Sequence, residues 1–168
     1  NGEWYKFDNN YLSNIRREVD LITLIPSKQI IQFDETAYQE WLNGLPKEQQ
    51  RYREWYLNEL LSKKYGYVNR DRSLNLFEGL RVELTDLYKE ETIYIIKIGK
   101  PQTLGYAIDQ ANASVRVLER KNSEIPINGI NSKVKYVCLW FFLERHKPIS
   151  HMSEIGSLIF LMKLANWR

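Results

Sequence analysis

Two neighbouring segments decide the fold: Arg81-Val-Glu-Leu-Thr-Asp-Leu-Tyr-Lys89 and Thr92-Ile-Tyr-Ile-Ile-Lys-Ile-Gly-Lys100. They are predicted to form two paired β-strands joined by a short turn. The second segment is apolar on both sides of Lys97, a pattern typical of a strand that is covered on both faces. A buried ammonium is costly unless an anion meets it, and the nearest candidate anions are Glu83 and Asp86. The sequence therefore predicts a lysine and two carboxylates close together on adjacent strands.

The composition indicates a folded domain. Of the 168 residues, 43% are hydrophobic and 13% are aromatic, which is ample material for a core. The net charge of +3 permits contact with nucleic acid without arguing for it. The single cysteine, Cys138, excludes an internal disulfide and a cysteine-rich zinc site. No apolar run approaches the ~20 residues that span a bilayer and no signal peptide is visible, so we expect a cytoplasmic protein without membrane contact.

The chain is expected to divide near residue 45. Residues 1–45 are predicted to form a small N-terminal α/β extension, with a short strand over residues 1–7 and helices capped by Asp8 and Asp34. The sequence Gly44-Leu-Pro46 is the clearest boundary. Residues 46–168 are expected to form the main domain.

The predicted element order in the main domain is α-β-β-β-α-β-α, giving an α/β fold with a mixed central sheet flanked by helices. A helix over residues 46–64, ended by Gly66, precedes three strand-like runs: residues 67–68 with 74–77, then 80–88, then 92–98. A helix over residues 104–120 and a polar loop lead to a strand over residues 134–143. A last helix is predicted to begin at Ser153.

This order of elements resembles the core of the restriction-endonuclease-like fold, the PD-(D/E)XK superfamily. In that superfamily an acid on the second strand and an acid two residues before a lysine on the third strand bind a divalent metal, for which Mg²⁺ suits the hard carboxylate ligands. The resemblance implies that Glu83 and Asp86 hold the metal and that Lys97 stabilises the attacking or developing charge. It also implies that Gln110, on the next helix, positions phosphate or water.

One position departs from the superfamily pattern. Ile95 stands two residues before Lys97, where a metal-binding carboxylate is expected. Either Glu83 and Asp86 supply the metal site together, or the site is degenerate. A Lys97 ion pair that merely stabilises a strand is the competing interpretation.

The helices on either side of these strands offer further candidates. By the same resemblance, Glu54 or Glu59 on the preceding helix would assist at the site. Lys100, Arg116 and Arg120 are candidates for a groove that binds nucleic-acid phosphates, with ordinary solvated helix ends as the alternative.

Short motifs over most of the chain are similar to a family of sporadically distributed prokaryotic proteins of unknown function. These motifs are Gly2-Glu-Trp-Tyr-Lys-Phe-Asp8, Val82-Glu-Leu-Thr-Asp-Leu-Tyr88, Ile96-Lys-Ile-Gly-Lys100, the helix with Gln110, and Ser153-Glu-Ile-Gly-Ser157. In that family the residue two before the lysine is usually apolar as well, which implies a variant site. Its members resemble proteins of mobile and anti-phage defence loci.

The leading hypothesis is a metal-dependent nuclease, or a nuclease-like domain that binds nucleic acid, with DNA as the expected partner. The alternative is a catalytically inactive module of the same fold that binds nucleic acid or a protein within a larger effector. A third hypothesis is a purely structural domain of such an effector. His146 and His151 have no acid or cysteine set nearby and are expected to be solvated.

Overall fold

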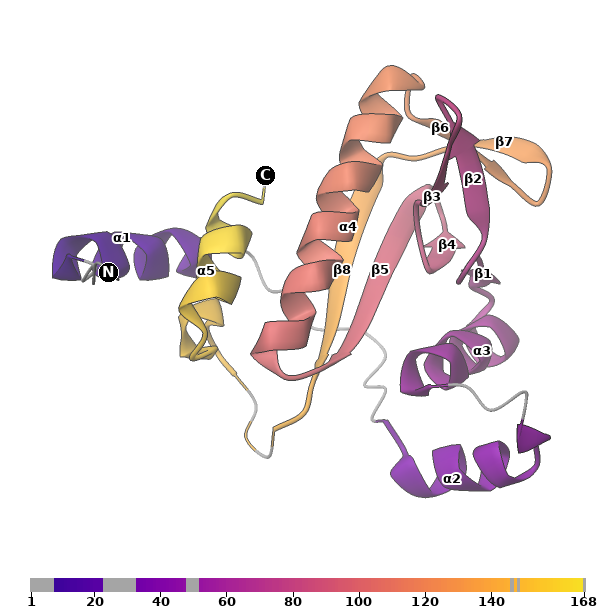
Figure 1. The fold of residues 1–168 in the computed structure, drawn as a ribbon, viewed down its shortest axis with the longest axis horizontal. Helices are drawn as coiled ribbons and strands as arrows, with labels where there is room; N and C mark the ends of the chain where they lie inside the picture. Colours follow the sequence, from indigo (N-terminus) through magenta and orange to yellow (C-terminus); the bar gives the residue numbers. More distant parts are fainter. Residues whose placement is uncertain (1–7, 23–32, 48–51, 146, 148, 168) are drawn as a thin grey trace, which may run out of the picture.

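The computed structural model describes residues 8–22, 33–47, 52–145, 147 and 149–167, which form a mixed α/β fold (Figure 1). The helices are α1 (Asn9–Asp20), α2 (Glu35–Asn43), α3 (Arg53–Tyr65), α4 (Pro101–Arg120) and α5 (Leu158–Ala165), with a 3₁₀ turn η2 (Met152–Glu154). The strands are β1 (Val68–Asn69), β2 (Leu74–Phe77), β3 (Leu80–Glu83), β4 (Leu87–Lys89), β5 (Thr92–Gly99), β6 (Glu124–Ile127), β7 (Ile130–Lys133) and β8 (Tyr136–Leu143). The strand predicted over residues 1–7, and His146, lie outside the described residues.

The central sheet has four strands in the order β1-β4-β5-β8. β5 and β8 are parallel and in register from Thr92↔Tyr136 to Gly99↔Leu143, whereas the other neighbours are antiparallel. The long helix α4 provides the crossover that a parallel pair needs. The hairpins β2–β3 and β6–β7 lie at the same end of the molecule (Figure 1).

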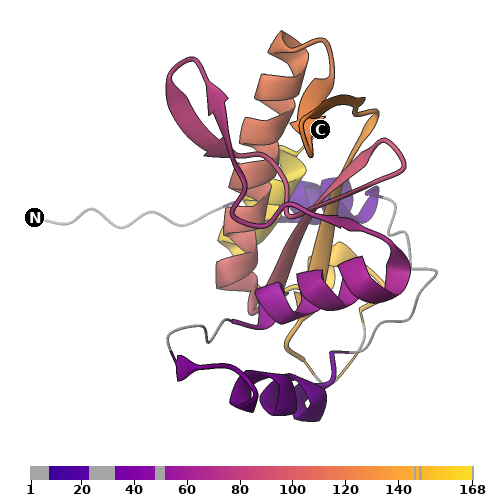
Figure 2. The ribbon, with the colours of Figure 1, turned by 90° about the vertical axis from the view of Figure 1, so that its right-hand side faces the viewer.

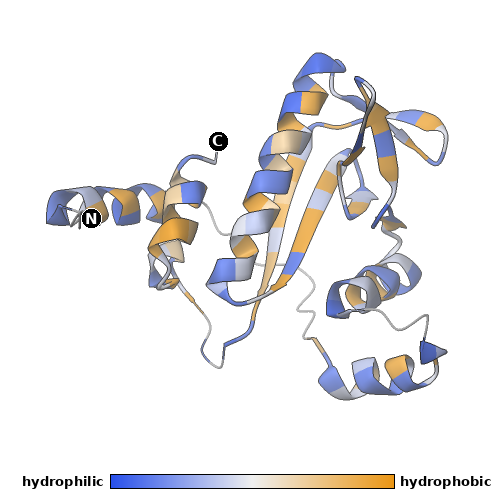
Figure 3. Ribbon diagram, in the orientation of Figure 1, coloured by the Kyte–Doolittle hydropathy of each residue, from blue (hydrophilic) through white to orange (hydrophobic). Residues whose placement is uncertain are grey.

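β5 is covered on both faces, as predicted. Ile95 packs with Ala107 and Ala111 of α4, while Ile96 packs in a cluster with Leu57 of α3. Helix α3 lies in front of the sheet in Figure 2, and the apolar residues of β5 and β8 stand out in Figure 3. This arrangement explains why the strand shows no polar alternation.

Several predicted helix boundaries are confirmed. The side chain of Asp8 accepts a hydrogen bond from the N–H of Asn10 at the start of α1, and Asp34 caps α2 in the same way. Gly66 ends α3 in the left-handed conformation, with φ of 70°. α1 packs through Ile15 and Val19, which join a cluster with residues of α4 and α5. The division near residue 45 remains a prediction.

The prediction of one continuous strand over residues 80–88 is wrong. β3 pairs with β2 in a separate hairpin, whereas β4 pairs with β5 in the central sheet. The hydroxyl of Thr85 accepts from the N–H of Tyr94 and donates to the carbonyls of Leu87 and Tyr94. This side chain thus takes the place of main-chain pairing and lets the chain change sheets between β3 and β4.

Two further expectations need correction. The predicted polar loop after α4 contains the hairpin β6–β7, which buries Ile125 and Ile127. The last helix begins after Ser157 rather than at Ser153, because Ser157 caps α5 while the Ser153 hydroxyl donates to Asp20 of α1. Among the described helices, none is long and apolar enough to cross a membrane.

Candidate metal centre

Three carboxylates from three different segments converge beside the central sheet. Asp71 lies in the turn after β1, Glu83 ends β3, and Asp86 immediately precedes β4. One oxygen of each residue lies within 4.8 Å of the others. The cluster contains both acids that the sequence predicted to act together, and it adds Asp71.

Main-chain hydrogen bonds hold this cluster in place. The N–H of Arg70 donates to the carbonyl oxygen of Asp86 at 2.7 Å, and the N–H of Arg72 donates to Glu83 Oε1 at 2.6 Å. Asn69 Oδ1 accepts from the N–H of Asp71 at 3.0 Å. The turn that carries Asp71 is therefore tied to the other two acids on both sides.

Asp86 occupies the point at which β4 and β5 separate. Its main-chain N–H still pairs with the carbonyl of Tyr94, but its Oδ2 accepts from the N–H of Ile96 at 2.6 Å. The side chain is buried and fixed in direction by this bond. One carboxylate oxygen is thus used for the fold, and Oδ1 takes no part in that bond.

The environment disfavours the ionised form of two of these acids. Burial raises the pKa of Asp86 to about 7, against the lowering effect of the Ile96 N–H, and the charges of Glu83 and Asp71 raise it further. Burial, followed by the charge of Glu83, raises the pKa of Asp71 to about 6. A divalent cation would offset this repulsion, because it favours the ionised form of each oxygen ligand.

A buried amide lies beside the cluster. Asn58 of α3 is 1% exposed, and within the described part of the chain neither its Nδ2 nor its Oδ1 forms a hydrogen bond of normal geometry. It lies close enough to Asp71 to lower the pKa of that carboxyl. An unpaired buried amide is costly and calls for an explanation. An amide oxygen is also a suitable ligand for a hard cation, so Asn58 and the three carboxylates together fit such an ion.

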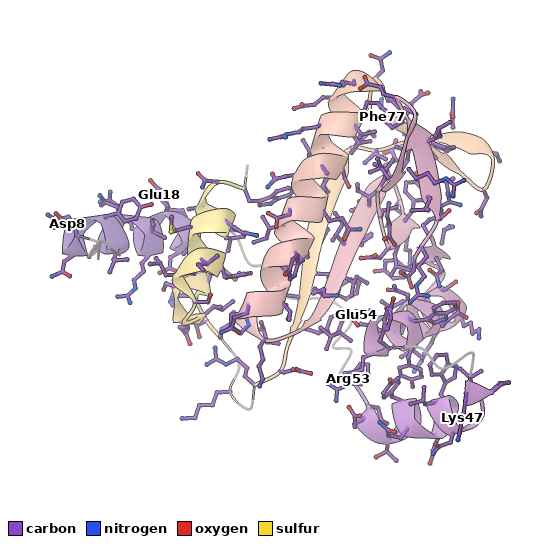
Figure 4. All side chains as sticks on the ribbon, in the orientation of Figure 1. Asp8, Glu18, Lys47, Arg53, Glu54 and Phe77 are labelled. Atoms are coloured by element: carbon purple, nitrogen blue, oxygen red, sulfur yellow. The ribbon has the colours of Figure 1, made fainter. Side chains whose placement is uncertain are left out.

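Lys97 pairs with a different acid from the one predicted. Its Nζ lies 2.9 Å from Glu54 Oε1, and the two side chains are 34% and 17% exposed. Glu54 is in the first turn of α3, beside the sheet (Figure 4). The expectation that Glu83 or Asp86 meets the ammonium directly is corrected, although the charge of Lys97 does lower the pKa of Asp86. The Lys97 side chain is thus partly exposed, and its charge acts on the cluster through Asp86.

The other helix candidate, Glu59, has structural partners. It accepts from Asn69 Nδ2 at 2.9 Å and pairs with Lys63 at 3.1 Å. Of the two glutamates proposed from the sequence, the structure brings Glu54 to Lys97.

Gln110 stays a prediction. It is half-buried on α4, and its Nε2 has no hydrogen-bond partner among the residues described. One turn further, the hydroxyl of Ser114 donates to the carbonyl of Leu84 at 2.7 Å, which ties α4 to the chain between Glu83 and Asp86. Among the described residues, no hydrogen bond or ion pair joins Gln110 to the carboxylates.

The predicted basic residues are spread along α4. Lys100 precedes the helix, Arg116 lies in its last two turns, and Arg120 ends it and pairs with Glu78 at 3.1 Å. A helix of 20 residues is about 30 Å long, so Lys100 and Arg120 are far apart. These residues do not form one compact phosphate site.

Comparison with known proteins gives a family but no activity. Searches of curated proteins and of solved structures find no match. The model of the Family of unknown function (DUF6119) matches residues 1–128. The matched region contains the three carboxylates, Asn58, Glu54 and Lys97, whereas the motif over residues 153–157 lies beyond it. Because the match covers more than half of the 168 residues, this chain belongs to the DUF6119 family of unknown function.

Proposed function

We propose that this protein is a metal-dependent nuclease that cleaves phosphodiester bonds, with DNA as its substrate, in a prokaryotic defence setting. The proposal is carried by one observation: the carboxylates of Asp71, Glu83 and Asp86 converge beside the Lys97 ammonium. The defence setting is supported by sequence resemblance alone.

The oxygen-rich donor set suits Mg²⁺ or Mn²⁺. Asp71, Glu83 and Asp86 would hold the ion, with Asn58 Oδ1 as a further ligand. When bound, the ion would supply an activated water and neutralise charge on the phosphate. Asp86 is held in its orientation by the Ile96 N–H, which fixes one ligand before the ion binds.

Lys97 would stabilise negative charge on the phosphate that is cleaved. Its side chain is 34% exposed, and its charge acts on Asp86 of the carboxylate cluster. Glu54 holds the ammonium in place through their ion pair at 2.9 Å. Glu54 is thus a positioning residue in this proposal.

The order of elements through the central sheet supports a restriction-endonuclease-like core. Leaving aside the two hairpins, the chain runs α3, β1, β4, β5, α4, β8, α5, which is the α-β-β-β-α-β-α order. Asp86 and Lys97 lie on the second and third of these strands or immediately beside them. Asp71 would take the role of the carboxylate that position 95 lacks.

The second candidate function is a catalytically inactive module that binds nucleic acid or a protein. The observation that favours it is Ile95, which is fully buried against Ala107 and Ala111. A carboxylate could not replace it without burying a charge.

Cleavage of supercoiled plasmid and of labelled oligonucleotides, with and without Mg²⁺ or Mn²⁺, tests the proposal. We expect metal-dependent cleavage that falls at least ~100-fold in Lys97→Met, in line with the loss of one charge-stabilising group. Asp86→Asn should also abolish cleavage. Lys163→Met is the matched control, because Lys163 pairs with Asp109 on the other side of α4 and is 35% exposed, close to the 34% of Lys97.

Two outcomes would count against this function. Cleavage that survives both Asp86→Asn and Lys97→Met in folded protein would place the reaction elsewhere. Binding of DNA with a steep salt dependence, but without cleavage at any metal concentration, would favour the inactive module.

A further inference from the structure

Beside the carboxylate cluster, an arginine lies over two aromatic rings. The guanidinium carbon of Arg72 is 4.6 Å from the ring centroid of Tyr52 and 5.2 Å from that of Trp55. An Arg72 Nη2–Tyr52 Oη hydrogen bond also joins the first pair. We call Tyr52, Trp55 and Arg72 the stacking platform.

The stacking platform and the cluster share one turn and one helix. Arg72 follows Asp71 directly, and its N–H donates to Glu83 Oε1. Tyr52 is the N-cap residue of α3, and Trp55 lies in its first turn, which also carries Glu54. A ligand held at the carboxylates would therefore have the stacking platform as its immediate neighbour.

The stacking platform is accessible to a ligand. Tyr52 is 54% exposed, although it offers a large apolar ring, and Arg72 is also exposed. Arg72 adopts a left-handed backbone conformation, with φ of 58°, which is uncommon for a residue other than glycine. This conformation lets its N–H bind Glu83 while its side chain turns back over the rings.

We propose that this platform binds an unpaired nucleobase of single-stranded DNA whose phosphate lies at the carboxylate cluster. This proposal rests on the proposed function. Aromatic rings and guanidinium planes stack on base faces, and the faces of paired bases are hidden inside a duplex. The positive charge of Arg72 adds attraction for the backbone, which the three acids would otherwise repel.

Binding of a fluorescein-labelled 20-nucleotide single strand and of the matching duplex, measured by anisotropy in Mg²⁺, tests the proposal. The Lys97→Met protein serves as the background because it is not expected to cleave. Single-stranded DNA should bind more tightly than the duplex. Adding Tyr52→Ala should weaken single-strand binding by about 5- to 100-fold, the range found for loss of one stacked base. Tyr52→Trp should retain it.

Two further variants separate stacking from charge. Arg72→Lys keeps the positive charge but loses the planar group, so it should weaken single-strand binding as well. Tyr106→Ala is the matched control: Tyr106 is 70% exposed and has Lys163 over its ring at 5.9 Å, but lies on α4 away from α3. It should bind as tightly as the background protein.

Three results would overturn the stacking proposal: unchanged single-strand binding in Tyr52→Ala, full binding in Arg72→Lys, or an equal loss of duplex binding. The proposed nuclease activity fails separately. Absence of metal-dependent cleavage by the unmodified protein would reject that activity while leaving the binding differences in place. If the unmodified protein cleaves DNA but Tyr52→Ala does not weaken single-strand binding, the stacking platform alone is rejected.

Discussion

The carboxylate of Asp86 accepts a hydrogen bond from the main-chain N–H of Ile96 at 2.6 Å, at the point where β4 and β5 separate. The bond takes the place of a strand pairing and leaves the acid buried beside Asp71 and Glu83. Asp86 therefore completes the sheet and also contributes to the candidate metal centre. Its burial and its hydrogen bond from Ile96 have opposite effects on its pKa. Burial raises its pKa to about 7, while the N–H favours the carboxylate.

The stability of the metal-free protein should fall as the pH rises from about 4 to about 7. The ordinary pKa of Asp86 is 3.8, so in this window the unfolded chain has lost a proton that the folded chain retains. The shift to about 7 corresponds to roughly 4 kcal/mol. Urea unfolding in EDTA across this range measures the slope, which Asp86→Asn should flatten. Asp109→Asn, an exposed acid paired with Lys163, is the control. Equal slopes in unmodified and Asp86→Asn protein would contradict the assignment.

Metal affinity should increase with pH. Protons must leave Asp86, with a pKa of about 7, and Asp71, with a pKa of about 6, before both can bind a cation. We expect Mn²⁺ affinity to rise about tenfold or more between pH 5.5 and pH 8. Calorimetric titration in buffers of different ionisation enthalpy should also detect the released protons. An affinity that is constant over this range would show that the cluster is not the binding site.

Replacing Asn58 by leucine should separate folding from metal binding. The amide forms no hydrogen bond of normal geometry among the described residues, although it lowers the pKa of Asp71, so Asn58→Leu should leave the metal-free stability unchanged or raise it. Mn²⁺ affinity should fall, because an oxygen ligand is lost. Asn69→Ala is the comparison: its side chain bonds to Glu59 and to the N–H of Asp71, so its removal should destabilise the protein. A strong destabilisation by Asn58→Leu would mean that the amide serves the fold.

Introducing a carboxylate at position 95 should disrupt folding. Ile95 is fully buried against Ala107 and Ala111, so Ile95→Glu would place an unpaired charge in the core. Ile95→Val should cost only about 1 kcal/mol. Thermal unfolding of the two variants compares these costs. If Ile95→Glu folds normally and binds Mn²⁺ more tightly, position 95 is available as a ligand and Asp71 need not replace it.

The sequence was sufficient to identify Glu83, Asp86 and Lys97 as neighbours in the candidate site. The unbroken apolar run around Lys97 predicted a strand covered on both faces and a nearby anion, and Glu83 and Asp86 do lie beside Asp71 in one cluster. The residue that pairs directly with Lys97, Glu54, was proposed only through the resemblance to the restriction-endonuclease-like fold. The helix caps at Asp8 and Asp34 were also predictable, because capping depends on local chemistry.

The positions of Asp71 and Asn58 in the site depend on tertiary structure and could not be predicted from the sequence. Asp71 reaches the cluster because the β2–β3 hairpin pairs Leu74 with Glu83 and so returns the chain to the turn after β1. The pairing of Leu74 with Glu83 could not be predicted, because residues 80–88 were expected to form one continuous strand of the central sheet. Asn58 gave no signal, since an asparagine within a helix is usually exposed, and its unusual burial appears only when α3 is packed on the sheet.

The separation of β4 from β5 has a consequence for solubility. β4 pairs with β5 only at Thr92–Tyr94, so among the described strands none covers that edge of β5 beyond Tyr94. Main-chain groups at a strand edge without a neighbouring strand can pair with another molecule, and a side chain that occupies those groups is one protection. Asp86 lies at this edge, and its Oδ2 takes up the Ile96 N–H that an added strand would otherwise bind. Loss of the Asp86 acceptor should therefore leave the Ile96 N–H free to pair with another strand and promote aggregation.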